Sequence, residues 1–168
     1  MTEKHFNLGV IEGADAVGKT TQIGFLREAL GPSVHFGKFP DKDGFFGKIV
    51  YESLAGKHGD FLGLSPYLAY LPYACDQADA PGELKDILLR QHIILDRYVP
   101  SNLAHQAAKV PKRERDALIA HIEEGTYERL GAVRPDFVIV LDMPVEVSLD
   151  LVKKRGGEKD QHERNVGY

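Results

Sequence analysis

A glycine-rich loop near the N-terminus constrains the fold of this chain more than any other feature. Residues 13–20 read GADAVGKT, which matches the pattern G-x-x-x-x-G-K-T, and they follow the apolar run LGVI at residues 8–11. An apolar run, this loop and a helix, in that order, predict a phosphate-binding loop. Gly13 and Gly18 allow backbone N–H groups to turn inward around a phosphate chain, and the helix beginning near Lys19 adds the positive end of its dipole.

Two side chains at the end of the loop extend this prediction to a metal ion. Lys19 can reach the outer phosphates of a nucleotide, and the Thr20 hydroxyl can bind the magnesium ion that accompanies them. The alternative is a glycine-rich turn that happens to precede a helix. The apolar run before the loop and the Lys-Thr pair at its end favour the phosphate site.

Size and composition limit the class of protein. The chain has 168 residues, which suits one domain over residues 1–168. No apolar stretch reaches the length of a membrane span, the N-terminus lacks a signal-peptide layout, and the single Cys75 fits a reducing compartment. We therefore expect a cytoplasmic protein. The net charge of −4 argues against general nucleic-acid binding, which relies on basic side chains, but it is compatible with a small anionic ligand.

Apolar runs and helical periodicity alternate along the whole chain. Strands are expected at residues 5–12, 34–39, 92–96 and 136–142. Helices are expected at residues 21–30, 46–54, 65–78 with a kink at Pro72, 83–91, 101–109, 113–130 and 144–154. This alternation predicts an α/β fold of three layers, in which helices cover both faces of a parallel sheet.

A carboxylate at the end of the third expected strand is the natural partner of the phosphate loop. Asp96 ends the run HIILD, and open α/β sheets bind ligands in the crevice outside the carboxyl ends of their strands. Asp96 is therefore a candidate for organising magnesium, and Arg97 for clamping a phosphate with its planar guanidinium. The alternative is a solvated Asp-Arg pair at a strand end.

Four blocks, at residues 10–22, 39–40, 96–106 and 134–142, together resemble the thymidylate kinases. They read VIEGADAVGKTTQ, FP, DRYVPSNLAHQ and RPDFVIVLD, in the order and at the spacing of that family. The resemblance implies a phosphate-loop kinase fold and transfer of the γ-phosphoryl group of ATP to dTMP, giving dTDP, with Mg²⁺ and in a homodimer. It also implies a further C-terminal strand, which we expect to be absent from these residues.

The resemblance assigns roles to individual residues. It implies contacts with the ATP phosphates for Gly13, Ala14, Asp15, Ala16, Val17, Gly18, Lys19, Thr20 and Thr21, and metal binding for Thr20 and Asp96. It implies acceptor binding for Asp15, Phe39, Pro40, Lys42, Tyr73, Gln77, Arg97, Ser101, His105 and Gln106. Asp15 would bind the sugar 3′-hydroxyl, Arg97 the acceptor phosphate, and Tyr73 would stack on the thymine. The catalytic groups implied are Lys19, Asp96, Arg97 and Arg155, the last in a lid over about residues 153–166.

Several positions depart from the common pattern of the family. Lys42 stands where an arginine often contacts the acceptor phosphate, so the charge is kept without the bidentate fork. Gln77 replaces an arginine that reaches the thymine carbonyl; its amide can both donate and accept, which leaves the base preference open. His105 replaces a frequent tyrosine. Ala16 occupies a position where some members carry a catalytic arginine, so Arg155 is the first candidate to supply that charge.

Other functions remain open at this point. The nearest is a phosphate-loop kinase with another nucleotide or nucleoside as acceptor. A GTP-binding switch is favoured only by the sequence DKDG at residues 41–44, and no N-K-x-D sequence is present to read guanine. A third alternative is an inactive nucleotide-binding domain. Tyr67, Tyr70 and Tyr73 lie at helical spacing, which is also typical of core packing.

Overall fold

The computed structural model describes residues 6–155, apart from the side chains of Pro81 and Arg155. The described chain divides into two compact units. The first, here called the sheet unit, contains residues 6–38, 82–98 and 133–155. The second, here called the helical unit, contains residues 39–81 and 99–132. Neither unit is continuous in sequence, and the expectation of one domain over residues 1–168 stays a prediction.

The sheet unit is built on four parallel strands, β1 (Leu8–Gly13), β2 (Val34–Lys38), β3 (His92–Asp96) and β4 (Phe137–Leu141). Their order across the sheet is β2-β3-β1-β4. The register aligns Ile11 with Asp96 and Lys38 with Asp96, so these residues meet at the same edge of the sheet. Because β1 and β3 are central, most of their apolar side chains are buried, and Leu8, Val10, Ile93 and Leu95 are fully buried.

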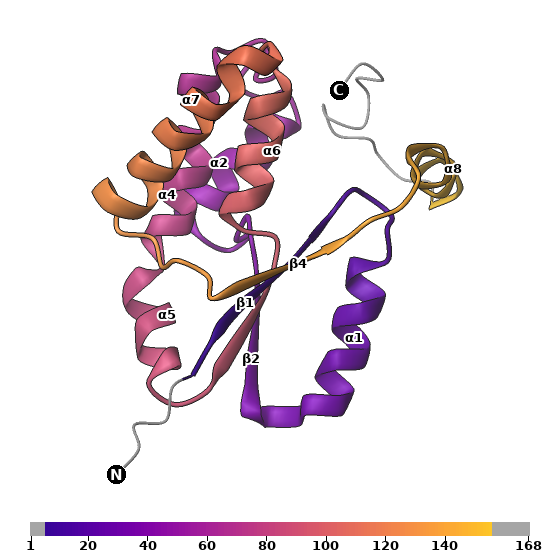
Figure 1. Ribbon diagram of the computed structural model, residues 1–168, viewed down its shortest axis with the longest axis vertical. Coiled ribbons are helices and arrows are strands. Elements are labelled where there is room, and N and C mark those ends of the chain that lie inside the picture. The colour runs from indigo at the N-terminus through magenta and orange to yellow at the C-terminus, as the bar shows by residue number, and fades with distance from the viewer. Residues whose placement is uncertain (1–5, 156–168) are drawn as a thin grey trace. The chain divides into compact units, whose positions relative to one another are not determined.

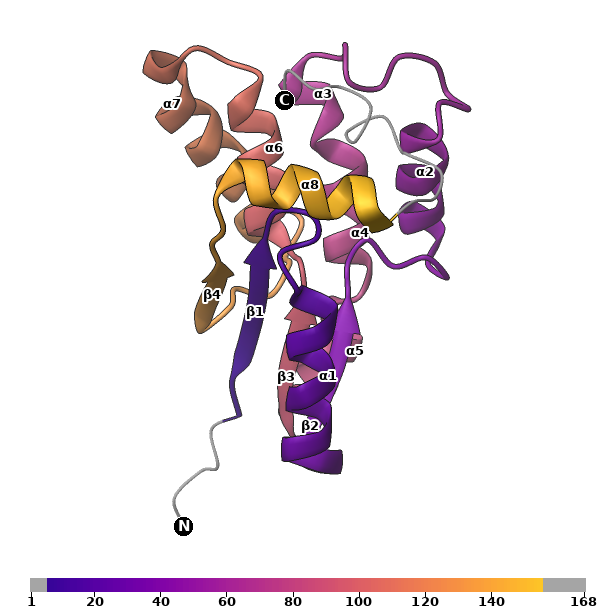
Figure 2. The ribbon, with the colours of Figure 1, turned by 90° about the vertical axis from the view of Figure 1, so that its right-hand side faces the viewer.

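Helices lie on both faces of this sheet. Figures 1 and 2 show α1 (Lys19–Leu30) on one side of the strands and α5 (Pro81–Leu88) on the other, while α8 (Val145–Arg155) follows β4. A short 3₁₀ turn, η1 (Gly31–Ser33), joins α1 to β2. The predicted α/β architecture, with a parallel sheet between helices, is confirmed.

The helical unit consists of α2 (Phe45–Leu54), α3 (Pro66–Ala69), α4 (Leu71–Asp79), α6 (Val99–Ala108), α7 (Lys112–Glu123) and a π-helical turn, η2 (Glu124–Arg129). One buried cluster joins α2 to α3 and contains Val50, Leu54, Phe61 and Ala69, with Tyr73 packed against it. A second joins α4 to α7 and contains Tyr70, Ala74, Leu118 and Ile122. Burial of these apolar side chains stabilises the unit.

Two helix predictions are wrong in detail. The helix expected over residues 65–78 with a kink at Pro72 is instead two helices, which meet at Tyr70. Pro72 lies in the first turn of α4, where its missing N–H has no intrahelical acceptor to lose, so it does not kink a continuous helix. The helix expected over residues 113–130 becomes π-helical after Glu123, where Gly125 lies close to the hydroxyl of Tyr70.

Within residues 6–155, no helix combines the length and apolar character that crossing a membrane requires.

Candidate active site

The loop between β1 and α1 has the backbone geometry that its glycines predict. Gly18 has φ +93° and Gly13 has φ +146°, values that favour glycine. A Cβ on Gly13 would also lie 2.6 Å from the carbonyl oxygen of Leu141, so any side chain there would clash with β4. Ala16 has φ +61° and is one of the two non-glycine residues with positive φ in the described chain. The loop therefore holds a tight turn at the N-terminus of α1.

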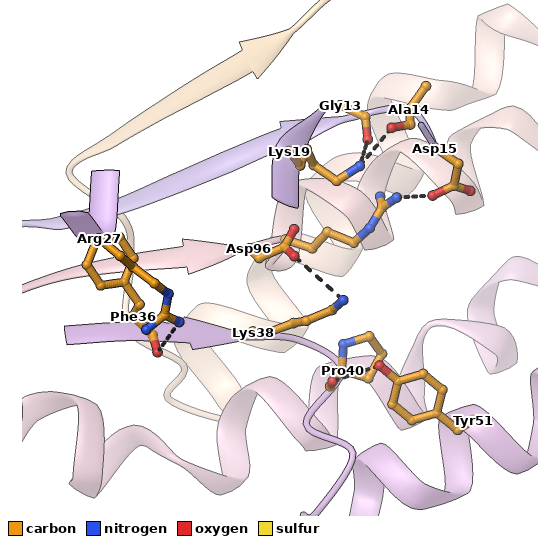
Figure 3. Close-up of polar contacts among 11 residues, drawn as sticks. Gly13, Ala14, Asp15, Lys19, Arg27, Phe36, Lys38, Pro40, Tyr51 and Asp96 are labelled. Carbon is orange, nitrogen blue, oxygen red and sulfur yellow. Dashed lines mark hydrogen bonds and ion pairs between the residues drawn. The ribbon is translucent and has the colours of Figure 1, made fainter. Parts of the chain in front are cut away.

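Lys19 closes over this turn. Its ammonium group donates hydrogen bonds to the carbonyl oxygens of Gly13 and Ala14, with Nζ–O distances of 2.8 and 2.7 Å (Figure 3). The residue is only 8% exposed. Burial lowers the pKa of Lys19, and the nearby Arg97 charge lowers it further, against the opposing carboxylates of Asp15 and Asp96. A phosphate oxygen can take the place of either carbonyl oxygen as the acceptor for the Lys19 ammonium group.

Asp96 has one carboxylate oxygen in an ion pair and one without a partner. Its Oδ2 lies 3.6 Å from the Lys38 ammonium, while its Oδ1 is buried and has no hydrogen-bond partner (Figure 3). A buried carboxylate oxygen without a partner is costly unless a ligand completes it. The described residues hold no group of three or more His, Cys, Asp or Glu side chains arranged for a metal. Mg²⁺ needs no such group, because it keeps several waters and binds one or two carboxylates with substrate phosphates.

Arg97 turns back towards the phosphate loop. Its φ is +64°, an uncommon value for a residue with a side chain, and its guanidinium Nη2 contacts Asp15 Oδ1 at 2.5 Å. The backbone is held there by two bonds: Arg97 N–H donates to Ile11 O at 3.1 Å, and Tyr98 N–H donates to buried Glu12 Oε1 at 3.0 Å. The turn after β3 is therefore anchored on β1.

Lys19, Asp96 and Arg97 line one cavity of about 370 Å³. The predicted site residues in its wall are Asp15, Ala16, Gly18, Lys19, Thr20, Thr21, Asp96 and Arg97. The predicted metal ligands Thr20 and Asp96 thus share a cavity with the lysine of the phosphate loop. The structure brings the start of α1, the side chains of Lys19 and Arg97 and the Asp96 carboxylate to one cavity wall, and such groups suit a nucleotide phosphate chain.

Three residues near this cavity were missed by reasoning from the sequence. Lys38 and Leu151 line its wall, and the Ser148 hydroxyl of α8 donates to the Asp15 carbonyl oxygen at 2.7 Å. Lys38 carried a usable signal, because it ends a strand just before Phe39-Pro40, as Asp96 ends its own strand. Ser148 carried none, since a serine in an amphipathic helix has no distinguishing pattern.

A sequence profile described as thymidylate kinase matches residues 11–166 of the chain. The chain belongs to the thymidylate kinase family. A thymidylate kinase of Mycobacterium tuberculosis is 32% identical over 166 residues, which cover 93% of this chain and 77% of the relative. A probable thymidylate kinase of Methanococcus maripaludis is 30% identical, over 89% of this chain and 66% of that protein.

One solved structure similar to this chain is the thymidylate kinase of Candida albicans. It has a TM-score of 0.74 and 27% sequence identity, with coverage of 95% of this chain and 71% of the other. That enzyme is described as having a broad substrate specificity. The phosphate-loop kinase fold expected from the sequence is thereby confirmed.

Most residues that the resemblance to thymidylate kinases assigns to the acceptor lie in the helical unit. Phe39 is buried, Pro40 accepts a hydrogen bond from the Tyr51 hydroxyl at 3.2 Å, and Lys42 is exposed. Tyr73 is half-buried, with its ring 6.0 Å from that of Phe61. Its packing role, considered above as the alternative to base stacking, is thus real for part of the ring.

The remaining acceptor residues differ in accessibility. Gln77, one turn after Tyr73 on α4, is 3% exposed, and Gln106 is 1% exposed with its Nε2 directed at Asn102 Oδ1, 3.4 Å away. Ser101 and His105 on α6 are half-buried. The side chain of Arg155 and most of the expected lid, residues 153–166, lie outside the described part of the chain.

Proposed function

We propose that this chain catalyses the ATP-dependent phosphorylation of dTMP to dTDP. The observation that carries the proposal is the meeting of Lys19, Asp96 and Arg97 in one cavity of a chain that belongs to the thymidylate kinase family. Phosphoryl transfer requires little covalent chemistry from the protein. It depends on positioned cations and hydrogen-bond donors that neutralise charge on the transferring group.

The phosphate loop holds the ATP. Backbone N–H groups of residues 13–21 surround the phosphates, and the Lys19 ammonium exchanges its carbonyl partners for phosphate oxygens. The Thr20 hydroxyl and the Asp96 carboxylate hold the Mg²⁺ that accompanies ATP, and the unpartnered Asp96 Oδ1 supports this role. When bound, the ion offsets negative charge on the phosphates.

Arg97 and Asp15 serve the acceptor. In the structure they pair with each other, and each has the chemistry to exchange that partner for part of the monophosphate. The guanidinium takes the acceptor phosphate through its planar fork, and the carboxylate takes the sugar 3′-hydroxyl. Their mutual ion pair keeps both side chains ordered before the acceptor binds.

Residues of the helical unit bind the base and the rest of the acceptor. Tyr73 stacks on the thymine ring and Gln77 hydrogen-bonds its edge, while Lys42 contacts the acceptor phosphate. Phe39, Pro40, Ser101, His105 and Gln106 complete the pocket. Arg155 brings a lid cation to the transferring phosphoryl group, the role that Ala16 cannot fill. The enzyme acts as a homodimer in the cytoplasm.

The competing functions differ in what they require. A kinase with another base preference keeps the whole phosphate site and changes only the partner of Gln77. A GTP-binding switch has no use for a monophosphate acceptor, and an inactive domain binds nucleotide without turnover. The relatives described above are named thymidylate kinases, which favours the dTMP kinase over all three.

The test is ADP formation from ATP and Mg²⁺ with dTMP, dUMP, dCMP, dGMP and dAMP offered singly. We expect turnover that depends on dTMP and falls sharply for the purines. Turnover with a different monophosphate alone would move the specificity and refute the dTMP assignment. ATP consumption that ignores every acceptor would refute the kinase. Lys19→Ala serves as the matched control, because it removes the phosphate-loop cation from the same fold.

A further inference from the structure

Asp76, on α4, is a buried carboxylate that the proposed reaction does not use. It is 3% exposed, although charged side chains are almost never fully buried without partners. Its Oδ2 accepts a hydrogen bond from the Asp41 backbone N–H at 3.0 Å. The Gly47 backbone N–H faces the same carboxylate and lowers its pKa, against the larger effect of burial. Both N–H groups come from the segment that leads from β2 into α2, so the carboxylate joins two separate parts of the helical unit.

The segment that donates to Asp76 is tightly wound. Gly44 N–H donates to the Asp41 carbonyl oxygen at 3.2 Å, and Asp43 N–H donates to Asp41 Oδ1 at 3.0 Å. A Cβ on Gly47 would lie 1.8 Å from the Asp41 carbonyl oxygen, so only glycine allows this approach. Because Asp41 and Gly47 are brought together in this way, their N–H groups converge on one acceptor.

Gly47 is the third residue of α2, and the first N–H groups of a helix have no partner within it. No side chain near the start of α2 caps the helix at its N-cap residue, Gly44. The Asp76 carboxylate faces this end of the helix from α4, and its negative charge lies at the positive end of the α2 dipole. A carboxylate is suited to this position because its charge attracts both N–H groups, whereas an amide is neutral.

The two parts that Asp76 joins carry opposite ends of the acceptor site. Phe39, Pro40 and Lys42 lie on or next to the wound segment, and Tyr73 and Gln77 lie on α4 on either side of Asp76 in sequence. We propose that Asp76 is a positioning residue for the acceptor: its carboxylate holds the segment that carries Lys42 against α4 and so sets the phosphate contact relative to the base contacts. This inference rests on the proposed function of these residues.

The test compares Asp76→Asn with the wild-type chain. The asparagine has the same shape but no charge, so its attraction for the Asp41 and Gly47 N–H groups is weaker. We expect the KM for dTMP to rise about tenfold, the ratio that corresponds to the loss of one hydrogen bond to a charged group. The KM for ATP should change less than about twofold, since the phosphate loop lies in the other unit. Amide hydrogen exchange at Asp41 and Gly47 should become faster.

Two further variants separate this role from general stability. Gly47→Ala forces the Asp41 backbone away from α2 and should reproduce the selective rise in the KM for dTMP. Asp79→Asn removes the same charge from an exposed position on the same helix and should leave both KM values unchanged. Faster exchange at Asp41 and Gly47 with an unchanged KM for dTMP would overturn the proposal, as would equal changes in both KM values. A wild-type chain without dTMP-dependent turnover would instead refute the proposed function.

Discussion

Asp76→Asn should change the pH dependence of stability in a direction that follows from the burial of this carboxylate. Burial raises the pKa of Asp76 from 3.8 to about 6; repulsion by Asp41 and Asp79 adds to the effect, and the N–H groups of Asp41 and Gly47 oppose it. The unfolded chain therefore releases this proton at a lower pH than the folded chain. Between the two pKa values the folded state binds more protons, so the free energy of unfolding falls as the pH rises.

The size of this loss follows from the shift. A change of about two pKa units corresponds to about 3 kcal/mol. Stability from this group is fully present below the unfolded pKa and is lost as the pH rises through about 6. About 2 kcal/mol of this loss of stability occurs between roughly pH 4.5 and pH 7.5. The rest occurs below pH 4.5, where part of the titration of the unfolded state lies.

The assay is urea unfolding of the wild type and of Asp76→Asn at those two pH values. Titrating groups that do not interact with Asp76 contribute equally to both proteins, so they cancel in the difference between them. The unfolding free energy of the variant minus that of the wild type should rise by about 2 kcal/mol from pH 4.5 to pH 7.5. Asp116→Asn, at an exposed position on α7, should give a difference that varies by less than about 0.5 kcal/mol. A difference for Asp76→Asn that stays constant with pH would refute the reasoning.

Three further substitutions test the site itself. Lys19→Ala should lower kcat by at least about a hundredfold. The thermal unfolding curve should keep its shape, since this side chain donates hydrogen bonds only to loop carbonyl oxygens. Normal turnover in the folded variant would contradict the phosphate-loop role. Tyr73→Ala should raise the KM for dTMP by roughly tenfold, the scale of one base stacked on an aromatic ring, and equal effects on ATP and dTMP would indicate a packing role. Asp96→Asn should raise the Mg²⁺ concentration that gives half-maximal turnover, measured by magnesium titration; an unchanged midpoint would remove Asp96 from the metal site.

The arrangement of the candidate phosphate site could be predicted from the sequence because its parts are local or lie at strand ends. Gly13, Gly18 and Lys19 are fixed by a short pattern, and their geometry follows from the turn that the pattern requires. Asp96 was recognised because the carboxyl ends of parallel strands share one edge of the sheet, and the register of β1 with β3 places it there.

The features that escaped prediction depend on contacts between distant segments. Whether Pro72 breaks a helix or begins one depends on where the preceding turn ends, and here Tyr70 divides α3 from α4. The burial of Asp76 depends on two N–H groups about thirty residues earlier in the chain, which no pattern around α4 announces. Lys38 was overlooked although it ends its strand as Asp96 does, because its pairing with Asp96 depends on the register between β2 and β3.

The central claim is that this chain moves the terminal phosphoryl group of ATP onto dTMP. The most direct measurement follows ATP labelled on the γ-phosphorus, with Mg²⁺ and dTMP, and separates the labelled products by chromatography. The account predicts that the label appears in dTDP in step with ADP, and that Lys19→Ala abolishes it. Label found only in inorganic phosphate, at a rate that dTMP does not change, would contradict the claim.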